Sequence, residues 1–466
     1  MSRHPAQTTL FALSVLAGAA VASDGTPGDD PLSNQGILEL ASGADINDVA
    51  ATYGFTVLES IQSRSLHLVQ FEPALTEDQF ELLSDPLLGD PDITDSELNH
   101  ASGDQGSGTQ SMLFFKSEID FNTQPLWGAL GLSAANQLAT GDGIVIAVID
   151  CGIDVDHPHF AGKIHPGAIN LLGTPGAFDE VGNGIDDDSD GLTDEMLGHG
   201  TFVAGLASSV APGAMIMPIR AMNDEGLGDG FTIARAVYHA IEHGADVINL
   251  SLGSETNLRV IDKAIHEAAD LGIIVIASAG NESERTPEYP AGSNDVGGVA
   301  ATDLNGVLAT FSNFGDHILA CAPGVAITGP DVGGWGEGDG TSAAAPLLAG
   351  TAALLLEQGK ILRYDDFRDA IRKTSIDIRA LNPGIDEKDL GAGLLDIEAA
   401  VNWPGACFAD LAEDDVLNFD DLDAFVTAFL AGDNHADFAE PRGVLNFDDL
   451  DFFVQSFLTG CPGDGP

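Results

Sequence analysis

Basic residues are scarce in this sequence. Its 466 residues include 17 Lys and Arg against 73 Asp and Glu, which gives a formal net charge of −56 at pH 7. A chain this acidic is repelled by nucleic-acid phosphates and by anionic lipid surfaces, so neither is an expected partner. The same charge suits a saline medium, where screening reduces self-repulsion, and it suits divalent cations.

Cysteine is also scarce, with four residues in the chain. Cys407 and Cys461 bracket the C-terminal segment, and in an oxidising compartment we expect them to form a disulfide. Cys151 and Cys321 fall at the ends of buried strands and are expected to be free thiols, although the sequence leaves a bond between them open.

Apart from the N-terminus, no stretch approaches transmembrane length without polar interruption. Residues 1–22 combine Arg3, the apolar run Leu10 to Val21 and an A-x-A ending at Ala22. This three-part pattern predicts a cleaved secretory signal peptide, with a short membrane anchor as the alternative. We therefore expect a secreted protein, extracellular or at the cell surface, whose mature form has no membrane span.

Three glycine-flanked stretches carry residues typical of nucleophilic catalysis. Asp150 ends a continuous β-branched run, which indicates a buried parallel strand. His199 and Ser342 each open an apolar run rich in small residues, which predicts two buried helices. In acyl transfer a serine attacks, a histidine carries the proton, and a carboxylate orients the imidazole. Taken alone, Thr341 or Ser342 would more often be the cap of a core helix.

These stretches read VIDCGID, GHGTFVAG and GTSAAAP, and they resemble the subtilisin-like serine proteases of peptidase family S8. The resemblance runs from about Trp127 to Val401, and Cys151 departs from it because Thr or Ser is usual there. It implies a catalytic triad, an oxyanion hole and a substrate-binding edge strand. The implied residues are Asp150, His199 and Ser342 for the triad, Asn281 for the oxyanion hole, and Ser251, Leu252, Gly253, Ala279 and Gly280 for substrate binding.

Strands and helices alternate through residues 113–402, which predicts an α/β fold with a doubly wound, mostly parallel sheet. Residues 34–100 read as a small α+β unit, followed by a Gly/Ser-rich linker that begins at Ser102. In position and pattern this unit resembles a subtilase propeptide, which folds against the catalytic domain, inhibits it and is cut off. A permanent N-terminal binding domain is the alternative.

An acidic insertion lies between the predicted strand and the predicted catalytic histidine. Asp186, Asp188, Asp190 and Asp194, with Gly191 among them, follow the D-x-D-x-D-G spacing of a calcium loop. The acid that completes an EF-hand is missing. We expect a structural calcium ion here, and the alternative is a solvated acidic loop.

The C-terminal segment, residues 406–466, contains an internal repeat. VLNFDDL at 416–422 recurs at 444–450, and each copy runs into a helix with an apolar stripe. The segment resembles dockerin-type calcium modules, which implies a small all-α fold and a cell-surface or scaffold partner, although a stabilising tail is also possible. The implied ligands are Asp410, Asp414, Asn418 and Asp421.

Together these observations predict a calcium-stabilised, secreted serine endopeptidase that is made as a preproprotein and processes itself. Its expected partners are protein or peptide substrates and its own propeptide. The alternative from another class is a catalytically silent adhesive protein that uses the same fold for display.

Overall fold

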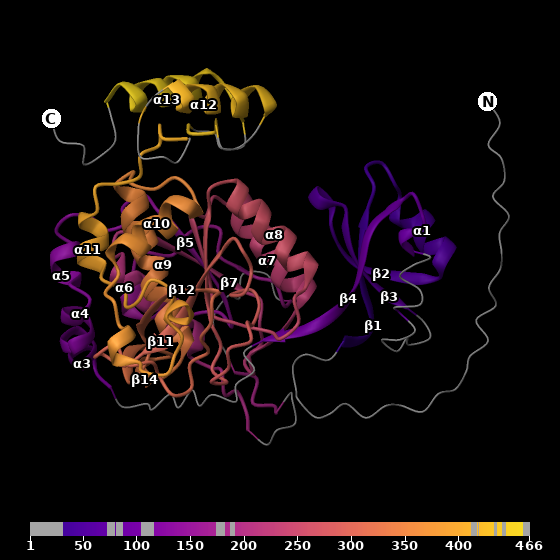
Figure 1. Ribbon diagram of the computed structural model, residues 1–466. Helices are drawn as coiled ribbons and strands as arrows, with labels where there is room; N and C mark the ends of the chain where they lie inside the picture. Colours follow the sequence, from indigo (N-terminus) through magenta and orange to yellow (C-terminus); the bar gives the residue numbers. More distant parts are fainter. Residues whose placement is uncertain are drawn as a thin grey trace.

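The structure is a computed structural model with three units along the chain (Figure 1). It describes residues 31–71, 80, 87–103, 116–173, 182–186, 192–411, 417, 419–432, 436–439 and 444–459. The predicted signal peptide lies outside these residues. The units are an N-terminal sheet, a central α/β domain and a C-terminal pair of helices.

A seven-stranded sheet forms the middle of the central domain. All of its strand pairs are parallel, in the order β12-β11-β10-β9-β5-β7-β6. Most of its positions carry Val, Ile or Ala and are buried, as expected of a sheet covered on both faces. The prediction of a doubly wound parallel sheet is confirmed. The strands are β5 (Val145–Asp150), β6 (Ile169–Asn170), β7 (Met215–Arg220), β9 (Val247–Leu250), β10 (Ile274–Ser278), β11 (Val296–Thr302) and β12 (Ile318–Pro323).

Helices cover both faces of this sheet. α6 (His199–Val210) and α9 (Thr341–Glu357) pack on one face in one large apolar cluster. α7 (Gly230–Glu242) and α8 (Arg259–Asp270) cover the other face in a second cluster. The domain also contains α3 (Glu118–Thr123), α4 (Pro125–Ala129), α5 (Leu132–Ala135), α10 (Tyr364–Thr374), α11 (Ile397–Asn402) and the hairpin β13 (Ile327–Asp331) and β14 (Gly334–Gly338).

The N-terminal unit is an antiparallel sheet with one described helix on it. The order β2-β3-β1-β4 continues into β8, a strand of the central domain. Helix α1 begins after the cap Asp45, which accepts a hydrogen bond from the Asn47 N–H, and ends at Gly54 with a φ of 79°. The elements are β1 (Pro31–Leu40), α1 (Ile46–Tyr53), β2 (Phe55–Ile61), β3 (Leu66–Phe71), β4 (Ile93–Gly103) and β8 (Leu227–Asp229).

Strand β4 corrects the predicted start of the linker. Ser102 and Gly103 belong to the strand, where they pair with Gly228 and Leu227 of β8. The sequence of β4 is mostly polar and has no period-2 apolar pattern, so its pairing partners, rather than its composition, make it a strand.

The C-terminal unit consists of α12 (Phe419–Ala431) and α13 (Phe447–Thr459), which share an apolar cluster of their own. The rings of Phe425 and Phe453 stack with their centroids 4.2 Å apart, so the two predicted stripes face each other. Cys407 is disulfide-bonded, and its expected partner Cys461 lies outside the described residues.

Two further observations concern the described part of the chain. Cys151 and Cys321 are buried and neither forms a disulfide, as expected. No described helix has both the length and the apolar character needed to cross a membrane.

Candidate active site

A buried hydrogen bond joins Asp150 and His199. His199 Nδ1 lies 2.8 Å from Asp150 Oδ1, and both side chains are 1% exposed. Asp150 ends β5, and His199 is the first residue of α6. Gly200 allows this approach, because a Cβ there would lie 2.0 Å from the Gly152 carbonyl oxygen. An Nδ1–H donated to the carboxylate fixes the tautomer with Nε2 as the proton acceptor.

Ser342 lies in the first turn of α9, whose N–H groups have no partner within the helix. The carbonyl oxygen of Ser342 accepts a hydrogen bond from Ser251 Oγ at 3.3 Å, and that hydroxyl accepts one from Asn249 Nδ2 at 3.0 Å. β9, which ends just before Ser251, therefore holds the beginning of α9 at the carboxyl edge of the sheet.

Asn281 is tied to the same helix start. Its Oδ1 accepts hydrogen bonds from the Thr341 N–H at 2.9 Å and from Thr341 Oγ1 at 3.1 Å. With Oδ1 occupied, Nδ2 is the atom of this amide left to donate toward a ligand. Thr341 was not among the residues selected from the sequence, although it lies inside GTSAAAP; it also accepts a hydrogen bond from the Gly280 N–H at 3.2 Å.

The residues expected to bind substrate follow neighbouring strands. Residues 251–253 leave β9, and residues 279–280 leave β10 after one more strand residue. These strands are parallel, with Leu250 opposite Ala277, so the two segments leave the sheet side by side. Because β5 is the other neighbour of β9, Asp150 lies at the same edge. Ligand crevices of open α/β sheets lie at this edge.

Two of the four acids of the predicted calcium loop, Asp186 and Asp194, belong to the described residues. The other two, Asp188 and Asp190, lie outside them. Asp194 accepts hydrogen bonds from the N–H groups of Asn183 at 2.9 Å and Gly184 at 3.0 Å. It also shares a hydrogen bond with Asp224 that lowers the pKa of Asp194, whereas burial and this bond raise the pKa of Asp224.

Two acids near this loop were missed in the sequence. Asp224 and Glu225 follow β7 and are 3% and 4% exposed, and Glu225 Oε1 accepts the Asp194 N–H at 3.0 Å. Adjacent acids just after a buried strand were the available signal. They bring oxygen ligands of the kind that calcium prefers toward the loop.

The C-terminal ligand set is also described only in part. Asp410 and Asp421 are described, and Asp421 is fully buried at the beginning of α12, whereas Asp414 and Asn418 lie outside. Asp449 occupies the equivalent place in the second repeat, where it accepts the N–H groups of Phe438 and Ala439, each at 2.8 Å.

One group in the described part of the chain brings three potential metal-ligating side chains together. One ligand atom each from Asp150, Cys151 and His199 lies within 4.8 Å of the others. The hydrogen bond between Asp150 and His199 already accounts for two of these groups, so this cluster is part of the candidate active site.

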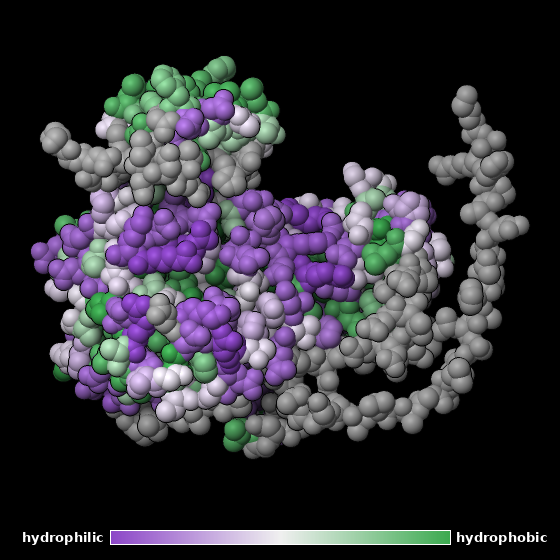
Figure 2. Space-filling view, in the orientation of Figure 1, coloured by the Kyte–Doolittle hydropathy of each residue, from purple (hydrophilic) through white to green (hydrophobic). Residues whose placement is uncertain are grey.

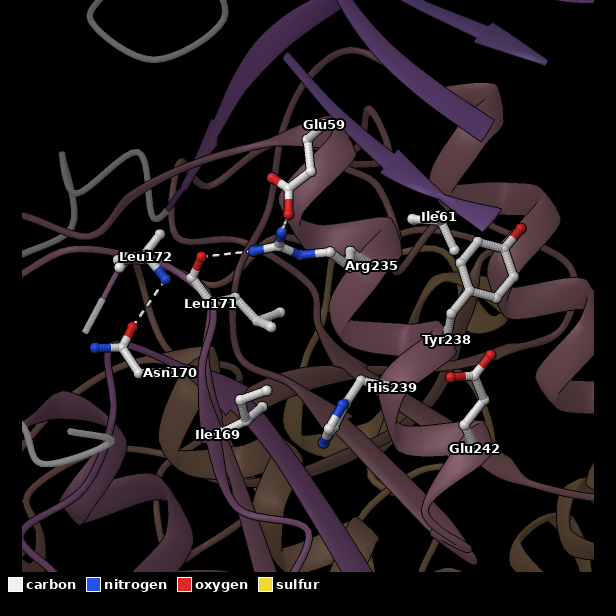
Figure 3. A pocket seen from close by; sticks show the side chains of 11 residues that line it. Glu59, Ile61, Ile169, Asn170, Leu171, Leu172, Arg235, Tyr238, His239 and Glu242 are labelled. Atoms are coloured by element: carbon white, nitrogen blue, oxygen red, sulfur yellow. Dashed lines mark hydrogen bonds and ion pairs between the residues drawn. The ribbon is translucent and has the colours of Figure 1, made fainter. Parts of the chain in front are cut away.

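A separate hollow of about 640 Å³ lies where the N-terminal unit meets the central domain (Figure 3). Glu59 and Ile61 of β2 face Arg235 and Tyr238 of α7 across it, and Arg235 forms an ion pair with Glu59. Its other lining residues are Ile169, Asn170, Leu171, Leu172, Gly173, His239 and Glu242. None of these residues belongs to the predicted catalytic or substrate-binding set.

Comparisons with known proteins agree with this geometry. Residues 141–397 match the model of the subtilase family. The chain is 36% identical over 241 residues to a thermophilic serine proteinase of Bacillus sp. strain AK1, covering 49% of this chain and 56% of that protein. It is 34% identical over 250 residues to thermitase of Thermoactinomyces vulgaris, covering 51% and 83% respectively.

The architecture is similar to the crystal structure of fervidolysin from Fervidobacterium pennivorans, described as a keratinolytic enzyme related to subtilisin. The TM-score is 0.66 at 23% identity, over 83% of this chain and 63% of that one, which supports the fold. The chain thus spans little more than half of the Bacillus proteinase and most of thermitase. By the family match and these identities, the chain belongs to the subtilase family.

Proposed function

We propose that this protein is a secreted serine endopeptidase, made as a preproprotein, that hydrolyses peptide bonds through Asp150, His199 and Ser342. The observation that carries the proposal is the buried Asp150–His199 hydrogen bond, at the sheet edge where Ser342 begins its helix. Membership of a family whose similar members are named proteinases supports it.

In the proposed reaction, His199 Nε2 takes the proton of Ser342 Oγ while that oxygen attacks the peptide carbonyl carbon. Asp150 holds the Nδ1–H and stabilises the imidazolium that forms. The negative oxygen of the tetrahedral intermediate accepts hydrogen bonds from Asn281 Nδ2 and the Ser342 N–H. His199 then returns the proton to the leaving amine, and water repeats the sequence on the acyl-enzyme.

The substrate would lie as an added strand along residues 251–253, with Ala279 and Gly280 on the other side. Both segments follow strands that are hydrogen-bonded to each other, so their spacing is fixed by the sheet. Substrates of this kind are proteins or peptides with an extended stretch.

The N-terminal unit, residues 34–100, is proposed to be an inhibitory propeptide that the enzyme removes from itself. Support comes from β4, which pairs with β8 of the central domain and ends at Gly103. The chain then has to pass residues 104–115 before Lys116, a stretch long enough to cross the candidate active site. A permanent N-terminal domain remains the alternative reading.

Structural calcium is proposed for the loop that contains Asp186 and Asp194. Support comes from three acids that meet at this loop: Asp194, whose N–H donates to Glu225 Oε1 at 3.0 Å, and the buried Asp224 beside it. A divalent cation between these carboxyl groups would offset their mutual repulsion. Excess EDTA should then lower the melting temperature of a protein lacking residues 406–466, and Asp188→Asn with Asp190→Asn should reduce the effect. An unchanged melting temperature would favour a plain acidic loop.

The C-terminal unit is proposed to attach the enzyme to a cell-surface or scaffold partner, with calcium at the loop of Asp410 and Asp421. Support comes from exposed apolar residues at equivalent repeat positions, since Phe419 and Phe447 are 84% and 83% exposed. Figure 2 shows hydrophobic residues gathered over these two helices, whereas the visible face of the central domain is mostly hydrophilic. Such a patch is typical of an interaction surface.

A fluorophosphonate probe tests the catalytic proposal, because it reacts covalently with an activated serine. We expect the purified, processed protein to be labelled at Ser342, and His199→Ala to abolish the labelling. Absence of labelling in the unaltered, processed protein would favour the other candidate, an adhesive protein that uses the subtilase fold without catalysis.

A further inference from the structure

A buried acid, Glu288, lies beside the proposed active site and takes no part in the proposed proton transfer. Its side chain is 8% exposed. Its neighbour Tyr289 exchanges two backbone hydrogen bonds with Ser254, at 2.8 and 2.9 Å. Ser254 directly follows the proposed substrate edge, so Glu288 is held against that edge by main-chain pairing.

The carboxylate of Glu288 lies between two glycines. A Cβ on Gly253 would be 2.4 Å from Oε2, and a Cβ on Gly280 would be 2.4 Å from Oε1. Neither position can carry a side chain without displacing the carboxylate. The backbone at Gly253 and Gly280 therefore approaches the carboxylate from two sides, and we call the place where residues 251–253 and 279–280 meet Glu288 the glycine-walled groove.

Two acids, Glu288 and Glu282, meet one neutral amide at the glycine-walled groove. Asn313 Nδ2 donates to Glu288 Oε1 at 2.9 Å and to Glu282 Oε2 at 2.8 Å, so one neutral amide serves two acids. Arg285 is the cation between these acids in the sequence, but it forms a bidentate pair with Asp389 at 2.7 and 2.9 Å. Its charge is thereby committed to a different carboxylate.

We propose that Glu288 makes this enzyme select Lys or Arg as the residue whose carbonyl is attacked, the P1 residue. The inference rests on the proposed function. With that carbonyl held at Asn281, the P1 side chain enters the glycine-walled groove and points toward Glu288. A long basic side chain lays its aliphatic stem along the backbone walls and places its charge at the carboxylate. An acidic P1 side chain meets like charge there and is rejected.

Peptide nitroanilides that differ only at P1 test this selectivity. We expect kcat/KM for Arg and Lys to exceed that for Phe and Leu by about tenfold or more, with Glu rejected. Glu288→Gln keeps an oxygen for the Asn313 hydrogen bond and removes the charge. It should lower kcat/KM for Arg by about 10- to 100-fold and leave Phe within about twofold. Glu284→Gln, an exposed acid on the same loop, is the matched control and should change neither.

A second measurement avoids dependence on peptide binding. Benzamidine, a small cation without a peptide backbone, should inhibit hydrolysis of the Phe substrate competitively, and Glu288→Gln should raise its Ki about tenfold or more. An equal Ki for both proteins would overturn the proposal. Labelling by the fluorophosphonate confirms that each variant is folded and active at the serine.

Labelling by the fluorophosphonate distinguishes failure of the P1 assignment from failure of the peptidase proposal. If the unaltered enzyme is labelled but cleaves Phe peptides as well as Arg peptides, the P1 assignment is wrong and the peptidase proposal stands. If the unaltered, processed enzyme is not labelled at all, both fail.

Discussion

The N-terminal and C-terminal units meet the central domain in different ways. The N-terminal unit shares a sheet, an apolar cluster and several ion pairs with it. The C-terminal unit has its own core, to which the central domain contributes Leu362 at the margin. The surfaces of the N-terminal unit and the central domain are complementary over a shared sheet and core. The C-terminal unit, with a core of its own, is typical of a tethered module.

The beginnings of two central helices show how closely the N-terminal unit fits. Glu97 accepts the N–H groups of Arg259 at 3.0 Å and Val260 at 2.7 Å, at the beginning of α8. Asn99 accepts the N–H of Phe231 at 3.1 Å, at the beginning of α7. Both residues belong to β4, so this one strand caps α8, whose N-cap residue Leu258 makes no side-chain cap, and adds an acceptor to α7, which Asp229 also caps. In Figure 1, α7 and α8 lie between the central sheet and the N-terminal unit.

The attachment of the C-terminal unit is thinner. The Ala406 N–H donates to the Lys360 carbonyl oxygen at 2.9 Å, and the Arg363 guanidinium lies 5.3 Å from the centre of the Phe438 ring. These contacts orient the unit, but they cap no helix and complete no sheet. The comparison suggests that the N-terminal unit acts at the active site and that the C-terminal unit acts elsewhere.

The largest expected effect is on removal of the N-terminal unit. Ser342→Ala should abolish processing and reduce peptide hydrolysis by about a thousandfold or more, because the nucleophile of an intramolecular cleavage is lost. Refolding without any other protease, followed by N-terminal sequencing, measures this. Normal processing by the variant would mean that Ser342 is not the nucleophile, and Ser133→Ala, at an exposed serine of α5, is the matched control that should still process.

A smaller effect is expected from the caps on β4. In the Ser342→Ala background, Glu97→Ala with Asn99→Ala should weaken docking of the N-terminal unit by about 2–4 kcal/mol, because the N–H groups of Phe231, Val260 and the more exposed Arg259 lose their acceptors. Hydrogen exchange of the β4 amides should accelerate accordingly. The matched control is Glu118→Ala with Asn136→Ala, away from this interface. Unchanged exchange would mean that the caps contribute nothing to docking.

These strands and helix caps show which features of the fold the sequence could predict and which it could not. The run that ends at Asp150 was predicted as a strand and forms β5, because a buried β-branched run needs no distant partner to be recognised. Strand β4 was not predicted, since its pairing with β8 joins residues more than 120 positions apart. Thr341 and Asp224 were missed for the same reason: their roles depend on Asn281 and Asp194, which only folding brings near.

Lowering the pH should destabilise the N-terminal unit by a smaller free energy than loss of the β4 caps does. Burial lowers the pKa of His67 on β3 below its ordinary value of 6.5, and its Nδ1 lies 2.7 Å from Ser60 Oγ. The opened unit then binds a proton more readily than the folded one, so stability is lost as pH falls through 6.5. We expect a loss of up to about 1 kcal/mol at pH 5.5, read from β3 amide exchange. His67→Gln should remove this pH dependence; an identical slope would exclude His67 as its source.

The smallest effect is expected from removal of the C-terminal unit. Deleting residues 406–466 should leave kcat/KM within about twofold and the melting temperature of the central domain within a few degrees, because its core is separate. Calorimetry and the same nitroanilide substrates measure both. A truncated protein that fails to mature would show that the tail belongs to the catalytic fold and would remove the contrast between the two units.

The scarcity of basic residues has a consequence at the N-terminal interface. Arg235, Arg259 and Lys263 of the outer helices each pair with an acid of the N-terminal unit, and the one basic residue among positions 31–103, Arg64, pairs back with Glu267. Loss of that unit would uncover these three cations together with Glu242 and Glu267, the two acids that Arg64 contacts. One side of a strongly anionic body would then carry charges of both signs, which would set its elution from an ion exchanger apart from that of the full chain.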